Sequence, residues 1–386
     1  MELDLRALLQ ALFVASVAFS VYTLAGYPLL LALLTRFRTR PVRKSAVTKS
    51  VTVLLPVRNG EQWLRAKLES LLALQYPPAM LQILVISNGS NDDTDAIAQE
   101  FTRTGRVELL RLAGGGKAAA LNAGLERARG EILFLTDVRQ SLEPESLRHL
   151  VACFADESVG AVSGELVIRD GTTLEELSVG LYWKYEKWLR KHESQLDSVM
   201  GATGCIYAMR RELARPLPPG TLVDDMFLPL AAFFAGYRVI LEDSAKAFDY
   251  PTALDTEFRR KVRTQAGVYQ IIRLYPQLLT PRNRMWFVFA SHKLARLLLP
   301  FALLLAAVTT FALEEPWRTP ALLLQALLYS AALFDLWIPE EISAKRISAP
   351  LRSFVVLLAA AFCAAFVRPS ENVWKETRVR AAGPLR

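Results

Sequence analysis

Long stretches without charged side chains, one near the start of the chain and three near its end, constrain the fold more than any other feature. Residues 7–35 carry no charge and are bracketed by Arg6 and Arg36. A helix needs about 20 apolar residues to cross a bilayer, so this stretch is long enough for a span. It has neither a basic start nor a small-residue cleavage site, which favours a retained anchor over a cleaved signal peptide.

Three further apolar stretches occupy the last quarter of the chain, at about 294–313, 320–338 and 351–367. Each is apolar all round, which indicates a membrane span rather than a surface helix. The net charge is +8, and much of it follows the first span at Arg36, Arg38, Arg40, Arg43, Lys44 and Lys49. Such a cluster favours the cytoplasmic side and anionic membrane lipids. No nucleic-acid partner is expected, because basic residues and aromatics do not alternate along one exposed stripe.

The sequence leaves the membrane topology open. If the central block is cytoplasmic, three later spans put the C-terminus outside. The tail, residues 369–386, is nevertheless basic, and the positive-inside rule favours the cytoplasm for it. One apolar stretch would then be re-entrant.

The central block alternates short apolar runs with helical patterns. The expected strands are 51–56, 81–86, 107–110 and 130–135, and the expected helices include 61–74 and 117–128. Strands that alternate with helices indicate a mainly parallel, doubly wound α/β sheet. Cysteines and histidines are few and widely separated, so neither disulfides nor a zinc site is expected.

Two acidic positions are the strongest candidates for chemistry. Asp137 follows the run 130–135, at the strand end where open α/β sheets bind ligands. Asp224 and Asp225 follow about ninety residues later, again beside apolar sequence. One site would hold a metal and phosphate, and the other would remove a proton. The alternative is that these residues form turns or cap helices.

Two polar turns are candidates for nucleotide binding. The turn after the first strand carries Asn59 and Glu61, which suit a base edge or ribose, with helix capping as the alternative. Three glycines, 114–116, precede Lys117 at the start of an alanine-rich helix. This spacing matches neither the Walker loop nor the dinucleotide fingerprint, so a phosphate role and a flexible helix entry both stay open.

Taken together, these segments resemble the family 2 glycosyltransferases. The resemblance covers roughly residues 50–265 and rests on segments that fall in the same order: 51–59, 87–94, 116–124, 130–137, 201–211, 223–225 and 257–263. It implies a GT-A nucleotide-sugar fold and transfer from a nucleotide diphosphate-sugar with inversion. The chain is similar to bacterial synthases of cellulose, hyaluronan and poly-N-acetylglucosamine.

The resemblance also implies roles for individual residues. Asp137 would bind Mg²⁺ or Mn²⁺, Asp225 would be the general base with Asp224 beside it, and Thr203 and Gly204 would face the acceptor. The implied nucleotide-sugar contacts are Pro56, Arg58, Asn59, Glu61, Asn88, Asp92, Lys117, Arg139, Arg260 and Arg263. Of these, Arg260 and Arg263 would clamp the diphosphate.

Three motifs depart from the family pattern. The DXD motif reads Asp137-Val138-Arg139, so its second carboxylate is replaced by arginine. Asn88 stands where an acidic residue often contacts the nucleotide. The QxxRW motif maps onto residues 260–264 and lacks its tryptophan, which weakens the case for long-chain synthesis.

The sequence therefore predicts a multi-pass enzyme of the cytoplasmic membrane that moves a sugar, with a UDP-sugar favoured, to a glycan or polyprenyl-lipid acceptor. The expected parts are an anchor (1–36), a cytoplasmic catalytic domain (45–265), an interfacial segment (266–292), about three spans (293–368) and a basic tail (369–386). A homo-oligomer or an export partner is possible. Two alternatives stay open: a processive polysaccharide synthase with export, and a non-catalytic scaffold that binds nucleotide-sugar.

Overall fold

The computed structural model describes residues 2–168, 174–250, 252 and 254–367. Within this part, a mixed sheet has the strand order β3-β2-β1-β4-β7-β6-β8-β5. The strands are β1 (Val51–Val57), β2 (Leu81–Asn88), β3 (Val107–Leu112), β4 (Ile132–Leu135), β5 (Ser141–Leu142), β6 (Val159–Ile168), β7 (Tyr207–Arg210) and β8 (Arg238–Asp249). The first four in spatial order are parallel and β7 is antiparallel to β4. The predicted α/β class and the four predicted strands are confirmed.

Helices cover both faces of this sheet, because alternate strand residues point to opposite sides. On β1, Val53 and Leu55 belong to a core with Leu64 of α3, whereas Leu54 belongs to a second core with Leu121 of α5. The helices of this domain are α3 (Glu61–Leu72), α4 (Thr94–Thr102), α5 (Gly116–Arg127), α6 (Ser146–Ala152) and α8 (Asp224–Phe234). Strands β1, β2 and β4 are therefore buried on both faces, as βαβ crossovers require, whereas the edge strand β3 is partly exposed.

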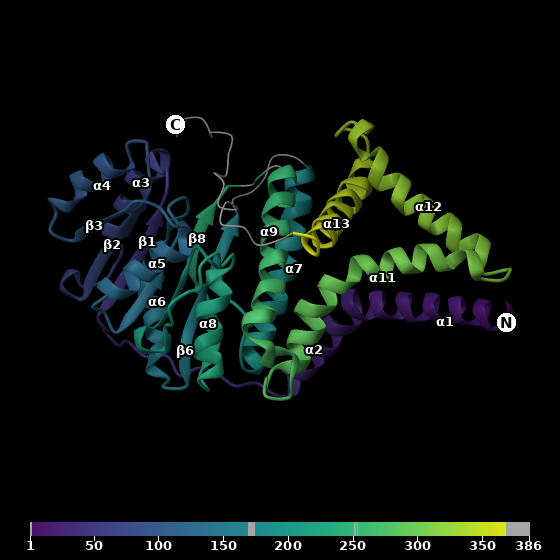
Figure 1. Cartoon of the computed structure of the whole chain (residues 1–386), viewed down its shortest axis with the longest axis horizontal. Coiled ribbons are helices and arrows are strands. Elements are labelled where there is room, and N and C mark those ends of the chain that lie inside the picture. Colours follow the sequence, from purple (N-terminus) through teal and green to yellow (C-terminus); the bar gives the residue numbers. More distant parts are fainter. Residues whose placement is uncertain (1, 169–173, 251, 253, 368–386) are drawn as a thin grey trace.

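Four helices are long and apolar enough to cross a membrane: Leu5–Phe37, Trp286–Ala312, Arg318–Trp337 and Lys345–Ala364. The first comprises α1 (Glu2–Val21), a π-helical turn and α2 (Tyr27–Phe37). The others contain α10 (Trp286–Val288) with α11 (Ala295–Thr309), α12 (Arg318–Phe334) and α13 (Lys345–Ala364). In Figure 1, α1 runs along α11, and α12 and α13 lie above them, with α13 packed against both α12 and α11. Each predicted apolar stretch is therefore helical.

Two long helices, α7 (Leu174–Leu196) and α9 (Leu254–Leu274), separate the sheet from the apolar helices (Figure 1). Helix α13 packs against both, and α2 packs against α7. The predicted interfacial segment 266–292 contains the end of α9, a 3₁₀ turn (Pro276–Leu279) and the start of the second apolar helix. The basic tail from Arg368 onward lies outside the described residues, so the predicted domain boundaries and the side of the C-terminus stay predictions.

Candidate functional site

The first predicted carboxylate, Asp137, lies in the loop that follows β4. A buried lysine holds this loop from below: Lys67 Nζ donates hydrogen bonds of 2.7 Å to Thr136 Oγ1 and to the Gln140 carbonyl oxygen. Thr136 in turn donates to the Cys205 carbonyl oxygen at 2.7 Å. Burial without a directly paired acid lowers the pKa of Lys67 to about 7. These bonds fix the backbone on either side of Asp137.

Lys117 joins the two predicted carboxylate positions. Its Nζ lies 3.0 Å from Asp137 Oδ1 and 3.0 Å from Asp224 Oδ1. Burial alone would lower the pKa of Lys117, but the three aspartates 137, 224 and 225 together raise it. Burial would raise the pKa of Asp137, yet Lys117 and the nearby Arg263 hold it below the usual value. The acids that are distant in sequence therefore meet around one ammonium group.

Asp225 lies in the first turn of α8, where exposed backbone N–H groups favour negative charge. Burial, together with the negative charge of Asp224, raises its pKa to about 6. The predicted acceptor-side loop touches this residue: a Cβ on Gly204 would lie 2.9 Å from Asp225 Oδ2, and the Ala202 amide donates to the Asp225 carbonyl oxygen at 2.6 Å. A carboxyl with this pKa suits a general base near neutral pH.

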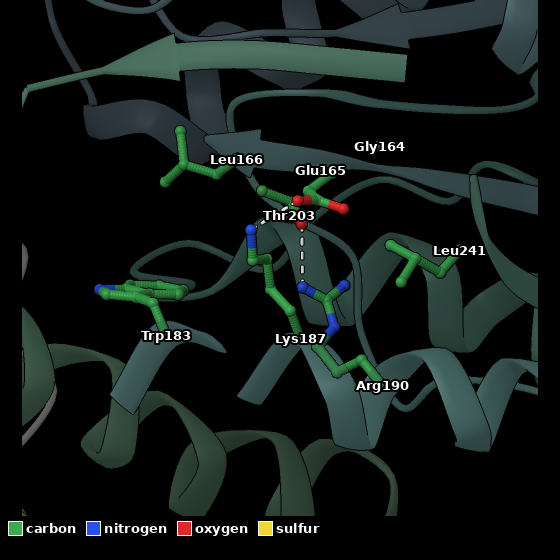
Figure 2. Close-up of a pocket in the computed structure, with 8 residues that line it drawn as sticks. All are labelled: Gly164, Glu165, Leu166, Trp183, Lys187, Arg190, Thr203 and Leu241. Atoms are coloured by element: carbon green, nitrogen blue, oxygen red, sulfur yellow. Dashed lines mark hydrogen bonds and ion pairs between the residues drawn. The ribbon is translucent and has the colours of Figure 1, made fainter. Parts of the chain in front are cut away.

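The predicted acceptor-side Thr203 is held by α7. Arg190 Nη1 donates to Thr203 Oγ1 at 2.9 Å, and its Nη2 donates to Ser163 Oγ at 3.0 Å and to the Gly201 carbonyl oxygen at 3.1 Å. Figure 2 shows Arg190, Lys187 and Trp183 projecting from α7 around Thr203, where they line a small pocket. The helix next to the apolar segments thereby sets the position of the loop beside Asp225.

Several predicted nucleotide contacts gather where β1 and β2 end. The Asn91 amide donates to Asn59 Oδ1 at 3.0 Å, and Asn59 itself has the left-handed φ of 49°. Asp92 reaches across the same edge, since its Oδ2 accepts from the Glu61 amide at 3.1 Å. Glu61 also accepts from the Asp93 amide at 2.9 Å. These carboxylates brace the two turns by accepting hydrogen bonds from their backbone amides.

Asn88 and the β1 residues are placed differently. Asn88 is buried at the end of β2, and its Nδ2 donates to the Gly116 carbonyl oxygen at 2.8 Å. Its Oδ1 is buried and has no hydrogen-bond partner in the described part of the chain. Pro56 is buried within β1 opposite Ile86, whereas Arg58 is exposed beyond the strand end.

The predicted arginines separate into two groups. Arg139 forms a buried ion pair with Asp249, and Arg260 donates to Glu257 Oε1 at 2.7 Å. Arg263 is the exception, because its charge acts on both Asp137 and Asp225. Its Nε is buried without a hydrogen-bond partner among the described residues, as is that of Arg139. The structure therefore brings Arg263 to the carboxylate site, whereas Arg139 pairs with Asp249 and Arg260 pairs with Glu257.

Known proteins match this arrangement in both sequence and fold. Residues 52–217 match the family model "Glycosyl transferase family 2". This segment is a family 2 glycosyltransferase domain. A probable glycosyltransferase, YdaM of Bacillus subtilis, is 25% identical over 58% of this chain and 56% of its own length. A poly-beta-1,6-N-acetyl-D-glucosamine synthase of Staphylococcus epidermidis is 27% identical over 36% of this chain and 35% of its own.

The glycosyltransferase domain and the helices around it also match a solved structure. The mannosyltransferase PcManGT from Pyrobaculum calidifontis, in complex with GDP-Man and Mn²⁺, superimposes with a TM-score of 0.71. It is 23% identical, and the match covers 94% of this chain and 99% of that one. The fold is therefore the predicted GT-A fold. The curated relatives are only partly covered: the chain spans about half of YdaM and less of the synthase.

The glycosyltransferase domain contains functional candidates that sequence reasoning missed. Lys67 occupies an apolar helical position between Leu64, Leu68 and Leu71, and this break in the pattern is a visible signal. Arg190 and the Asp249 partner of Arg139 carry no such signal, because their roles depend on distant segments. Tyr207, whose hydroxyl lies 3.4 Å from Asp224 Oδ2, was missed for the same reason.

A divalent ion fits this site only together with a substrate. No group of three or more metal-ligating side chains occurs in the described residues. Mg²⁺ commonly needs just one or two carboxylates besides substrate phosphates and water. Asp137 is partly exposed, and Lys117 contacts only its Oδ1 in the described structure. Its carboxylate suits an ion that arrives with a diphosphate.

Proposed function

We propose that this chain is a membrane-bound inverting glycosyltransferase that moves a sugar from a nucleotide diphosphate-sugar to a hydroxyl of a glycan or lipid-linked acceptor. The convergence of Asp137, Asp224 and Asp225 around Lys117 carries the proposal. It joins a candidate diphosphate site to a candidate base within one cluster. The family 2 domain and the GT-A fold support the reaction class.

Asp225 is the proposed general base. The acceptor oxygen attacks the anomeric carbon, the bond from that carbon to the leaving diphosphate oxygen breaks, and the hydroxyl proton moves to the Asp225 carboxylate. A single displacement inverts the anomeric centre and needs no enzyme nucleophile. With a pKa of about 6, Asp225 is largely ionised at neutral pH and is more basic than an ordinary aspartate.

Asp137 is the proposed protein ligand for Mg²⁺ or Mn²⁺. A bound divalent ion supplies Lewis-acid stabilisation of the leaving diphosphate. PcManGT is a mannosyltransferase solved with GDP-Man and Mn²⁺, which supports such an ion here. Lys117 and Arg263 bring fixed positive charge to the same cluster, and Arg263 has a free Nε donor among the described residues. These two side chains stabilise the phosphates and orient them toward Asp137.

The nucleoside is proposed to lie over the ends of β1 and β2, beside Asn59, Glu61 and Asp92. Asn88 Oδ1 is a buried acceptor that needs a donor, and the ring N–H of uracil or of guanine would supply one. The sequence favours a UDP-sugar, whereas PcManGT binds GDP-Man. Both bases therefore belong in the test.

The proposed location is the cytoplasmic membrane, with the catalytic domain facing the cytoplasm. Four apolar helices support a multi-pass arrangement. The basic residues from Arg36 to Lys49 lie between the first of these helices and β1, and the positive-inside rule favours the cytoplasm for them. Protease protection of a tag placed before β1, in closed vesicles, tests the orientation.

The function is tested with the purified full chain in nanodiscs against UDP- and GDP-sugars with Mn²⁺. We expect one donor to raise the melting temperature and to release nucleoside diphosphate steadily. Absence of both effects with every donor overturns the proposal. Binding without release favours the scaffold alternative, and a long product by mass spectrometry favours the processive synthase.

A further inference from the structure

Two cationic side chains converge on one tyrosine hydroxyl where α7, α9 and α11 meet. Lys261 Nζ donates to Tyr182 Oη at 2.6 Å, and it lies 4.2 Å from the centre of the Tyr182 ring and 5.7 Å from that of Trp183. Arg296 Nη1 lies 3.5 Å from the same oxygen. We name Tyr182, Trp183, Lys261 and Arg296 the junction cluster.

Positive charge is in surplus at the junction cluster. Arg296 forms an ion pair with Glu186, which also accepts from Lys293 at 3.4 Å. Lys261 has no ion pair with an acid in the described part of the chain, and its contacts are with the Tyr182 hydroxyl and the two rings. Glu186 is shared by three basic side chains, Arg296, Lys293 and His292, and His292 also contacts Glu193. The charge of Lys261 therefore has no acid to neutralise it among the described residues. Buried or half-buried charge of one sign favours a ligand of the other sign.

The junction cluster also contains hydrogen-bond donors that lack acceptors. Trp183 Nε1 and Arg296 Nη2 are buried, and neither has a hydrogen-bond partner in the described residues. An unmade bond to a buried donor costs about 1–3 kcal/mol, so an acceptor is expected to complete such a set. Both groups can only donate. The ligand should therefore present several acceptor oxygens with negative charge, which is the chemistry of a phosphate group.

The position of the junction cluster indicates where this phosphate comes from. Arg296 belongs to the apolar helix Trp286–Ala312, and the apolar helix α13 packs against both α7 and α9. Figure 1 shows α7 and α9 between the sheet and these apolar helices. At this place a phosphate attached to a lipid chain would have apolar helices beside its chain.

Helix α7 connects the junction cluster with the catalytic carboxylates. Trp183 and Arg190 are seven residues apart, so they lie on the same face of the helix. Trp183, Arg190 and Thr203 line one small pocket (Figure 2), and Arg190 holds the loop that contacts Asp225. A ligand at the junction cluster is thus next to the acceptor side of the site.

We propose that the junction cluster binds the phosphate of a lipid-linked sugar acceptor. This inference rests on the proposed function, in which Asp225 takes a proton from a hydroxyl. Because a phosphate nucleophile needs no such base, the phosphate is the part that is held and a sugar hydroxyl is the part that reacts. The acceptor is therefore a sugar joined to a lipid through phosphate, and a neutral glycolipid or diacylglycerol lacks the group that the cluster recognises.

Binding of farnesyl phosphate to the full chain in phosphatidylcholine nanodiscs tests the inference, with farnesol and inorganic phosphate as comparison ligands. We expect farnesyl phosphate to bind at least tenfold more tightly than either. Lys261→Met should weaken its binding about tenfold or more, and Tyr182→Phe should weaken it less. Arg259→Gln is the matched control on the same helix, because Arg259 is exposed and pairs only with Asp255 in the described structure. The control should bind farnesyl phosphate as the parent chain does.

Nucleoside diphosphate binding, measured on the same samples, separates the two proposals. Equal binding of farnesol and farnesyl phosphate, or unchanged binding by Lys261→Met, overturns the lipid-phosphate inference. Inorganic phosphate that binds as tightly as farnesyl phosphate also overturns it, since the lipid then contributes nothing. If nucleotides bind and farnesyl phosphate does not, the proposed transferase function stands and the lipid-phosphate inference is wrong. If farnesyl phosphate binds and no nucleotide does, the transferase function fails instead.

Discussion

The carboxylate site around Lys117 and the junction cluster are both groups of charged side chains assembled from distant segments. Their net charges have opposite signs. In the first, Asp137, Asp224 and Asp225 surround Lys117, and negative charge is in excess. In the second, Lys261 and Arg296 converge on Tyr182, and positive charge is in excess. An acid surplus favours cations and, together with burial, raises the pKa of Asp225, whereas a cation surplus favours phosphate. The sign of the surplus thus distinguishes a proton-accepting site from an anchoring site.

Asp225→Asn should have the largest effect on transfer. The amide keeps the shape of the side chain but accepts no proton, so we expect turnover to fall about 10²- to 10⁴-fold. Nucleoside diphosphate release reports the rate, and calorimetry should find nucleotide binding unchanged within about twofold. Asp243→Asn is the control, since Asp243 pairs with Lys191 on the surface. If Asp225→Asn keeps the parental turnover, Asp225 is not the general base.

Lys117→Met should change both stability and pH dependence. Removing one partner of a buried ion pair costs about 3–5 kcal/mol, and here it leaves two carboxylates without their shared cation. In the parent chain we expect the rate to rise with pH through about 6, as Asp225 loses its proton. Lys117 lowers the pKa of Asp225, so in the Lys117→Met variant the rate should rise at a higher pH than in the parent chain.

Thermal unfolding and a pH–rate profile measure these two effects. Lys184→Met is the control, because Lys184 is an exposed lysine. A lower melting temperature with an unmoved pH midpoint would contradict the electrostatic role of Lys117. That result would instead favour a direct nucleotide-sugar contact of Lys117, which the family resemblance implies.

Gly204→Ala tests whether the acceptor-side loop positions the base. The new Cβ would lie 2.9 Å from Asp225 Oδ2, closer than real Cβ contacts allow, so the carboxylate must move. A misplacement of about 1 Å can cost about 10²-fold in rate, and we expect a loss of about 10- to 100-fold here. Gly180→Ala is the control, because an added Cβ there meets nothing within 4 Å. Parental turnover by the Gly204 variant would mean that the loop tolerates the shift.

The sequence predicts the scaffold of the carboxylate site better than its contacts. Short apolar runs identify the strands, and the parallel arrangement then brings the residues at their carboxyl ends to one edge. That logic locates Asp137. The family resemblance assigns Lys117 to the nucleotide-sugar, whereas its contact with Asp224 depends on how α5 and α8 pack on the sheet. No local pattern in the chain reports that packing.

The junction cluster is harder to predict for the same reason. Its residues come from three helices whose aromatic and basic composition fits either a membrane interface or an ordinary core. Only the packing of α7, α9 and α11 brings Lys261 and Arg296 to Tyr182. Likewise, Arg139 reads as a substitute for the second DXD carboxylate, whereas its ion pair with Asp249 is a long-range contact. The order of the motifs therefore predicts the fold, whereas the hydrogen-bond and ion-pair partners of single side chains depend on tertiary contacts.

Glu193→Gln should have the smallest effect on catalysis and mainly affect the attachment of the apolar helices. Glu193 on α7 is buried, and its Oε1 accepts from Tyr27 Oη at 2.9 Å and lies 2.5 Å from His292 Nδ1. An amide keeps one acceptor oxygen but loses the charge, so we expect a loss of about 1–3 kcal/mol of stability. The melting temperature in detergent should fall, while nucleotide affinity should not change. Glu212→Gln, at an exposed position, is the control. If nucleotide affinity falls with the melting temperature, the packing of the apolar helices against α7 also supports the nucleotide site, and the carboxylate site is not independent of the helices beside the junction cluster.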